Sequence, residues 1–232
     1  MRPEILFPLF GDIKTLEGVG PKIREHLIRL KGALIVHLLW HFPVGIIDRS
    51  FRPNIEDVLA GRIATLQVMV GRHQKPPSKK VPYKVTCYDD TGKIKLVFFH
   101  AHEKYLVDNL PEGKEVIISG IIEKFGGNVQ MTHPDYIVGI NNAHELPKIE
   151  PIYPLTAGLV SKRLQNVIGA SLKRVSPLPE WSNESLVKKC GWPTWFNALT
   201  LVHHPTCEGD LSLISPARER LAYDELLANQ LA

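Results

Sequence analysis

The chain has 232 residues, 44% of them hydrophobic and 22% charged, so it can form two or three small folded units and is not a disordered polymer. Its formal net charge of +4 permits a nucleic-acid partner without requiring one. The three cysteines are widely spaced, which argues against a disulfide framework and favours a reducing intracellular setting. Neither a secretory signal nor a membrane span fits the sequence.

Residues 14–31 have the pattern of a helix-hairpin-helix motif. Gly18 and Gly20 permit a tight turn with positive φ, and Pro21 suits the first turn of a following helix. Backbone N–H groups in such a turn, together with the helix N-terminus, would point at a phosphate oxygen. A helical hairpin used only for packing is the alternative. The DNA contacts predicted for this motif are Gly18, Gly20, Lys22 and Arg24.

A further helix is predicted over residues 34–42, because Pro43 ends the apolar pattern there. An extended segment that contains Asp48 and Arg49 then leads into the next unit. Arg49 is expected to pair with Asp48 or with another neighbour. This segment therefore connects the N-terminal helices to a unit of predicted strands.

Residues 62–139 predict five strands with one helix between the third and the fourth. Apolar and polar residues alternate with a period of two, or form a short apolar run, at 65–70, 83–88, 94–98, 116–122 and 129–131. The helix is predicted over residues 101–110, where Pro111 ends it. This order is that of an OB fold, a five-stranded Greek-key β-barrel that commonly binds single-stranded nucleic acid. A small β-sandwich would give a similar series of strands.

The segment Arg72–Lys80 joins the first two predicted strands and is too rich in lysine and proline to be buried. Loops of this kind on an OB barrel commonly contact phosphate, so we predict that it binds DNA. A solvated loop without a ligand is the alternative. The predicted contacts are Arg72, Lys75, Lys79 and Lys80.

The C-terminal third of the sequence is predicted to be helical. A proline-punctuated connector over 147–154 precedes helices at 161–175, 184–190 and 193–202, and a last helix over 217–232. Ser182 is expected to cap the second of these helices, and Pro193 to open the third. The last pattern has no stop signal, so we expect the chain to be a piece of a longer protein.

The predicted fold class is therefore α+β, with a five-stranded barrel flanked by N-terminal and C-terminal helices. We expect three consecutive parts. They are a helical segment with the helix-hairpin-helix over 1–60, an OB-fold unit over 61–146, and a connector with helices over 147–232.

An ordered set of motifs then resembles the N-terminal, wedge-containing part of the RecG family of bacterial ATP-dependent DNA helicases. The resemblance is carried by Leu16–Lys22, Leu38–Pro43, Asp48–Arg49, the barrel, Tyr153–Leu159, Leu178–Trp181 and Ala217–Leu227. It implies binding of branched DNA, at stalled forks and Holliday junctions, for fork regression and branch migration in recombination and repair. It also implies helicase motor domains that use ATP and Mg²⁺ and follow this stretch, and a bacterial, nucleoid-associated cytoplasmic location.

The resemblance further implies that wedge aromatics after the third strand stack on separated bases. By alternation Phe98 faces inward with Leu96, which leaves Phe99 facing outward and Tyr105 on the following helix. Packing in the core or within the helix is the alternative for both. Phe99 and Tyr105 are therefore the predicted stacking residues.

The sequence lacks the motifs expected for ATP hydrolysis and for metal binding. No G-x-x-x-x-G-K-[ST] occurs, so we expect no ATP hydrolysis by this chain, and we predict no catalytic residue. The histidine pairs His100 with His102, and His203 with His204 near Cys207, lack the spacing of a zinc site, so we predict no metal. The alternative function is a protein-interaction module whose basic barrel binds an acidic peptide, such as the tail of a single-strand-binding protein.

Overall fold

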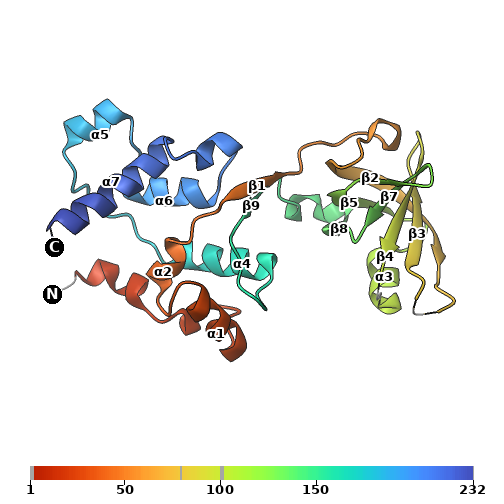
Figure 1. Ribbon diagram of the computed structural model, residues 1–232, viewed down its shortest axis with the longest axis horizontal. Helices are drawn as coiled ribbons and strands as arrows, with labels where there is room; N and C mark the ends of the chain where they lie inside the picture. The colour runs from red at the N-terminus through yellow and green to blue at the C-terminus, as the bar shows by residue number, and fades with distance from the viewer. Residues whose placement is uncertain (1–2, 79, 100–101, 232) are drawn as a thin grey trace. The chain divides into compact units, whose positions relative to one another are not determined.

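Figure 1 shows the chain as a computed structural model, which describes residues 3–78, 80–99 and 102–231. The chain forms two compact units. The helical unit comprises Met1–Ile47 together with Glu150–Ala232, and the sheet unit comprises Asp48–Ile149. Among the described residues, no helix combines the length and the apolar character needed to cross a bilayer.

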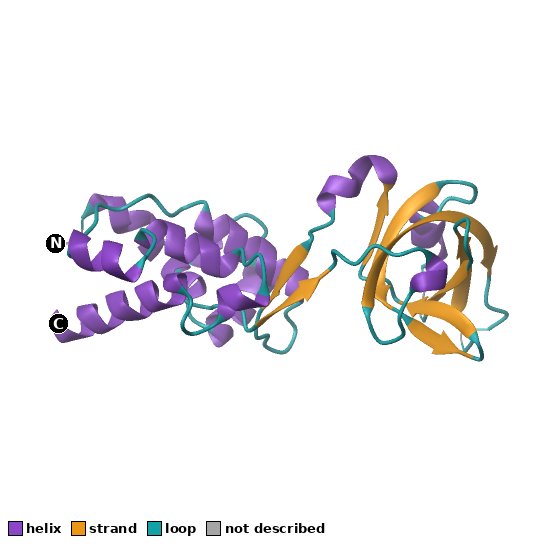
Figure 2. Cartoon of the chain, turned by 90° about the horizontal axis from the view of Figure 1, so that it is seen from above, coloured by secondary structure: helices purple, strands orange, loops and turns teal. Residues whose placement is uncertain are grey.

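The helical unit contains the helices of both ends of the sequence, drawn in purple in Figure 2. Its N-terminal part contains the 3-10 helices η1 (Glu4–Phe10) and η2 (Ile13–Thr15) and the α-helices α1 (Pro21–Leu30) and α2 (Ile35–Leu39). Its C-terminal part contains α4 (Ser161–Leu172), α5 (Glu184–Cys190), α6 (Trp195–His203), η5 (Glu208–Leu211) and α7 (Pro216–Leu231).

The division into two units differs from the three consecutive parts predicted, because the two ends of the sequence share one core. Each helix buries an apolar stripe, and stripes from both ends meet. The fully buried leucines of this shared core include Leu27, Leu38, Leu164 and Leu199. Leu27 and Leu38 come from the N-terminal part and Leu164 and Leu199 from the C-terminal part, so helices from both ends of the sequence build one core.

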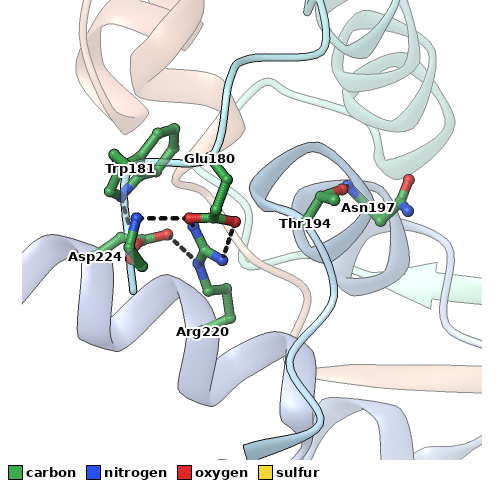
Figure 3. Close-up of polar contacts among 7 residues, drawn as sticks. Glu180, Trp181, Thr194, Asn197, Arg220 and Asp224 are labelled. Atoms are coloured by element: carbon green, nitrogen blue, oxygen red, sulfur yellow. Dashed lines mark hydrogen bonds and ion pairs between the residues drawn. The ribbon is translucent and has the colours of Figure 1, made fainter. Parts of the chain in front are cut away.

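Two helix starts differ from the predictions. Asn183, and not Ser182, caps α5, since its side chain accepts hydrogen bonds from the N–H groups of Ser185 and Leu186. Pro193 does not open α6, because Thr194 is the N-cap and its hydroxyl accepts from the N–H of Asn197 at 3.3 Å (Figure 3). Both caps satisfy donors that the first helical turn leaves unpaired.

The chain crosses between the units on two extended segments, which pair with each other. The strands β1 (Gly45–Asp48) and β9 (Ile149–Ile152) form a two-stranded sheet. Backbone hydrogen bonds continue beyond it on both sides, from Val44 N to Ile152 O and from Arg49 N to Lys148 O, each 2.8 Å long.

The sheet unit contains seven strands in its described residues, in the order β6-β7-β4-β3-β2-β5-β8. They are β2 (Ile63–Gln74), β3 (Tyr83–Tyr88), β4 (Lys93–Phe98), β5 (Glu115–Ile121), β6 (Glu123–Phe125), β7 (Asn128–Thr132) and β8 (Tyr136–Gly139). The helix α3 (Glu103–Asn109) lies between β4 and β5, and the 3-10 helices η3 (Ile55–Asp57) and η4 (Ile140–Glu145) flank the sheet in sequence.

The predicted strand number of five is therefore too low. The five predicted strands correspond to β2, β3, β4, β5 and β7, with α3 between the third and the fourth as predicted. The additional strands β6 and β8 have only three and four residues, too short for a period of two to be recognised in the sequence. Pairing with β7 and with β5 makes them strands.

Figure 2 shows that the sheet is strongly curved. The residues that it buries form one apolar core. In β4 the predicted alternation is confirmed for Ile94 and Leu96, which are fully buried, and for Lys93, which is exposed. Val97 of β4 and Thr65 of β2 are buried as well, although the period of two places both on the outward side.

On the opposite side of the core β5 comes close to β7 at Gly120, where a Cβ atom would lie 2.9 Å from Met131 Sδ. A side chain at this position would have to displace the Met131 side chain and would lie 3.3 Å from Pro134 Cα, so glycine favours the close approach.

Candidate nucleic-acid interface

The turn between η2 and α1 has the geometry predicted for the hairpin, but not its first helix. Gly18 has φ of +77°, and Gly20 precedes Pro21, the first residue of α1. The preceding helix is reduced to η2, a single 3-10 turn of three residues. Beside the turn is a hollow of about 420 Å³, lined by Lys14, Val19, Gly20, Pro21, Arg24 and Glu25.

Arg24 already has a partner within this turn. Its Nε donates to Asp12 Oδ1 at 3.0 Å and its Nη2 to Asp12 Oδ2 at 2.6 Å. The hydrogen bond from Arg24 holds the pKa of Asp12 well below its usual range. Arg24 therefore fixes the start of η2 against α1, and any phosphate would compete with Asp12 for it. Lys22, by contrast, is exposed.

A second arginine, which the sequence reasoning missed, lies against the same turn. The Nη1 atom of Arg163, on α4, is 3.2 Å from where a Cβ on Gly18 would be. Arg174, just beyond α4, donates to the carbonyl of Thr15 at 3.4 Å. The two arginines are separated from the turn by more than a hundred residues of sequence, so only the tertiary structure brings this positive charge to it.

The basic segment Arg72–Lys80 is partly strand and partly loop. β2 extends to Gln74, so Arg72 is an exposed strand residue and not part of the loop. Lys75 forms an ion pair with Glu103 at the start of α3, which raises the pKa of Lys75 by a hydrogen bond. Lys80 is exposed, and Lys79 lies outside the described residues. Arg72 and Lys80 thus present their charge to solvent.

The aromatic pair at the end of β4 is oriented as the alternation predicts. Phe98 is buried, whereas Phe99 is 49% exposed and Tyr105, on α3, is 58% exposed. The N–H of Phe99 donates to His133 Nε2 at 3.0 Å, and the two rings lie 5.9 Å apart. Phe99 is therefore an exposed ring on a fixed backbone. The alternative prediction, that Phe99 and Tyr105 pack in the core, is wrong.

The Asp48–Arg49 segment has a structural use within the sheet unit. Arg49 is buried, and its Nη1 donates to Ser119 Oγ at 3.1 Å and to Asp135 Oδ2 at 3.0 Å. Its guanidinium also lies 4.8 Å from the centre of the Tyr136 ring. A buried arginine needs such partners, and Arg49 thereby ties the chain to β5 and β8 where it enters the sheet.

No metal site is apparent in the described part of the chain, where no three His, Cys, Asp or Glu residues gather. His203 is buried, and its ring nitrogens contact Tyr153 Oη at 3.0 Å and Leu39 O at 2.9 Å. Burial lowers the pKa of His203 to about 4. His203 is therefore a core histidine, and His100 lies outside the described residues.

Comparison with known proteins decides the family. The family model of the RecG wedge domain matches residues 12–175. The chain belongs to the RecG wedge domain family. ATP-dependent DNA helicase RecG of Pasteurella multocida is 26% identical and matches 95% of this chain, but only 32% of its own length. The RecG of Thermotoga maritima is 28% identical, over 97% of this chain and 29% of its own length.

A solved structure of RecG bound to a three-way DNA junction has the same fold as this wedge chain. The TM-score is 0.79 at 24% sequence identity, and the match covers 95% of this chain and 30% of that one. Both the sequence and the fold comparisons therefore show that the chain spans about a third of the length of its RecG relatives.

The C-terminal RecG motifs Leu178–Trp181 and Ala217–Leu227 meet in one polar cluster (Figure 3). Arg220 on α7 is fully buried and donates two hydrogen bonds to the Glu180 carboxylate, each 2.8 Å long. Its Nε donates to Asp224 Oδ2 at 2.8 Å, and the indole N–H of Trp181 donates to the other oxygen of Asp224 at 2.9 Å. These motifs of the RecG wedge chain thus hold α7 in place.

Proposed function

We propose that this chain binds branched DNA, at stalled forks and Holliday junctions, as the wedge-containing part of a RecG-type helicase that acts in recombination and repair. Membership of the RecG wedge family supports the proposal, and the relative solved with a three-way DNA junction names the kind of substrate. Within the longer protein, this binding would serve fork regression and branch migration.

We infer that the sheet unit is an OB-fold, Greek-key barrel. β2 pairs with β5, β4 pairs in parallel with β7, and β5 pairs with β8, so three pairings join strands that are not consecutive in sequence. The close approach of β5 and β7 at Gly120 supports a sheet that closes on itself. Such a barrel offers a rigid surface for nucleic acid.

The observation that carries the proposal is the exposed ring of Phe99. Its backbone N–H donates to His133, which fixes the backbone that carries the exposed ring, and an exposed ring can stack on an unpaired base. Tyr105 is a second exposed ring on α3. Stacking favours the junction over plain duplex, because strands that separate at a branch point expose the faces of their bases, whereas paired bases in a duplex hide them.

Phosphate contacts come from both units in this proposal. Gly18, Gly20 and Lys22 surround the turn before α1, and Arg72 and Lys80 are exposed on the sheet unit. Arg24 and Lys75 would contribute less, because each would first have to leave a carboxylate. Lys79 is retained as a proposed contact from the sequence alone.

The same proposal assigns ATP hydrolysis, with Mg²⁺, to the parts of the RecG relatives that this chain does not cover. The chain alone should therefore not hydrolyse ATP. It would act on the nucleoid in the bacterial cytoplasm. Binding of the acidic tail of a single-strand-binding protein to the basic segment is a further part of the proposal, and competition with DNA would test it.

The test is fluorescence anisotropy of the chain with a fork, a duplex and a single strand of matched length, each across a salt series. We expect the tightest binding to the fork. Phe99→Ala should lower the ratio of fork affinity to duplex affinity at least about fivefold, because it removes the stacking of one base. Phe7→Ala, which removes an exposed ring from the helical unit, is the matched control. Equal affinity for fork and duplex, unchanged by Phe99→Ala, would refute the proposal.

A further inference from the structure

His133 has a backbone conformation that is unusual for a residue with a side chain. Its φ is +47°, and apart from glycines no other residue in the described ranges has a positive φ. A glycine adopts such a conformation without strain, whereas a histidine does so at a cost. Strained residues persist where the surrounding structure over-determines them, and they gather at binding sites. The side chain of His133 is therefore a candidate for a function.

His133 directly follows β7 and stays attached to β4. The two strands pair in parallel, with Val97 opposite Thr132. The N–H of His133 then donates to the carbonyl of Val97 at 2.9 Å. The backbone of His133 is thus fixed beside the end of β4, where Phe98 and Phe99 follow Val97 in the sequence.

Two aromatic rings and one hydrogen bond hold the imidazole of His133. The Phe98 ring lies edge-on to it, with an interplanar angle of 88° and 5.9 Å between the ring centres. The Phe99 ring is tilted by 33° and is also 5.9 Å away, and the Phe99 N–H donates to Nε2 at 3.0 Å. Both His133 and Phe99 are exposed, so their rings form adjoining parts of one surface.

The hydrogen bond from Phe99 decides which nitrogen of the imidazole carries a hydrogen. A ring nitrogen accepts only when it carries none, so the neutral ring of His133 has its hydrogen on Nδ1. An imidazolium would have N–H groups at both positions and would lose the bond from Phe99. No described residue accepts a hydrogen bond from Nδ1 of His133. With respect to these residues, the Nδ1–H group is available to an external acceptor.

A DNA strand whose base stacks on Phe99 brings such an acceptor with it. Phosphate and sugar oxygens accept most of the hydrogen bonds in protein–DNA interfaces. Because the imidazole adjoins the Phe99 ring, a phosphate beside the stacked base would lie within reach of His133. A contact of this kind fixes the position of the strand and is independent of its sequence.

We propose that His133 is a further DNA-binding residue, which donates its Nδ1–H to a phosphate oxygen of the unpaired strand that stacks on Phe99. This deepens, and rests on, the proposed binding of a branch point. The contact differs from those of the lysines, because a neutral imidazole adds a hydrogen bond without adding a charge. It serves the unpaired strand and not the duplex, since it depends on the base that Phe99 holds.

Two substitutions of His133 separate the donor from the acceptor. The asparagine amide lies near the position of Nδ1 and can donate there, and asparagine tolerates a positive φ. The glutamine amide reaches the position of Nε2 and can accept from Phe99. His133→Gln should weaken fork binding at least about threefold, the effect of one hydrogen bond, and His133→Asn should weaken it less. His144→Gln, which replaces an exposed histidine of the same unit, is the matched control.

The measurement is anisotropy of the whole chain with a fork and with a duplex, each across a salt series. Neither His133 variant should change duplex affinity or the salt slope, because no charge is removed. Amide exchange in β4 and β7 reports whether each variant keeps its fold. Forks with a methylphosphonate, which replaces one charged phosphate oxygen by a methyl group, at successive linkages test the acceptor. At the contacted linkage the methylphosphonate should weaken the wild type more than His133→Gln, which has already lost the bond.

A loss of fork affinity in His133→Asn at least as large as in His133→Gln would overturn the contact and leave His133 only its bond to Phe99. Unchanged fork affinity in His133→Gln would overturn it too. A lower salt slope in His133→Gln would show a charged imidazolium, and absence of coupling at every linkage would rule out phosphate as the acceptor. Each of these results, with the fork preference of the wild type intact, refutes this inference alone, whereas a wild type that binds fork and duplex equally refutes the proposed function.

Discussion

Replacing Arg220 by alanine should strongly destabilise the helical unit. Arg220 is fully buried, and three of its nitrogens donate to the carboxylates of Glu180 and Asp224 at 2.8 Å. Its guanidinium also lies 5.2 Å from the centre of the Trp181 ring. Loss of one partner from a buried ion pair costs about 3–5 kcal/mol. We expect about 3 kcal/mol, because the Glu180 side chain is 26% exposed and keeps part of its hydration.

Tryptophan fluorescence can follow this loss in the helical unit alone. The four tryptophans of the chain, Trp40, Trp181, Trp192 and Trp195, all lie in that unit. The urea midpoint read from them therefore does not depend on whether the two units unfold together. Arg29→Ala, which removes an exposed arginine from α1, is the matched control and should shift the midpoint little.

A double variant separates lost charge pairing from lost packing. In the Arg220→Met variant the carboxylates of Glu180 and Asp224 lose their shared cation. Adding Glu180→Gln removes one of these two charges, so it should recover part of the stability lost in Arg220→Met. A free energy of unfolding for Arg220→Ala within about 0.5 kcal/mol of the wild type would refute the reasoning, since surface substitutions have effects of that size.

Three further predictions concern acid stability, sheet closure and DNA binding. Because burial lowers the pKa of His203 from 6.5 to about 4, the unfolded chain takes up this proton first as the pH falls. As the pH falls from 6.5 to about 4, the helical unit should therefore lose about 3 kcal/mol of stability, which its urea midpoint would report. In the His203→Gln variant this loss should be smaller. Gly120→Val should destabilise the sheet unit by about 1–3 kcal/mol and speed amide exchange in β5 and β7. Gly139→Val should have neither effect, because no atom lies within 4 Å of a Cβ at that position. Equal amide-exchange rates in the two variants would contradict the inference that β5 and β7 close the sheet at Gly120. Lys80→Ala should reduce the salt slope on duplex by about 0.9, and Lys75→Ala by less because Lys75 pairs with Glu103; equal slopes would show that the ion pair is irrelevant.

Local patterns predicted the elements with long, regular repeats. The alternation around Ile94 and Leu96 gave the correct inward side of β4, and so the exposure of Phe99. Pro21 marked the start of α1, and Gly18 marked the turn. These predictions succeed because one strand or one turn of helix already contains the whole signal.

Short elements and caps were not predictable in the same way. β6 has three residues, and it is a strand only because β7 pairs with it. Serine and asparagine are both good N-cap residues, so the sequence does not decide whether Ser182 or Asn183 caps α5. The helix starts one residue later than predicted, a difference that sequence patterns do not resolve. The first helix of the hairpin motif shrinks to η2 in the folded chain.

The sequence by itself determined the class of each long element, the turn at Gly18, the outward ring of Phe99 and the resemblance to the RecG family. Only the tertiary structure decided which charges remain available, because the carboxylates of Asp12 and Glu103 that pair with Arg24 and Lys75 come from other elements. Side-chain spacing along one strand is fixed by covalent geometry, but neighbours across strands and helices are fixed by packing.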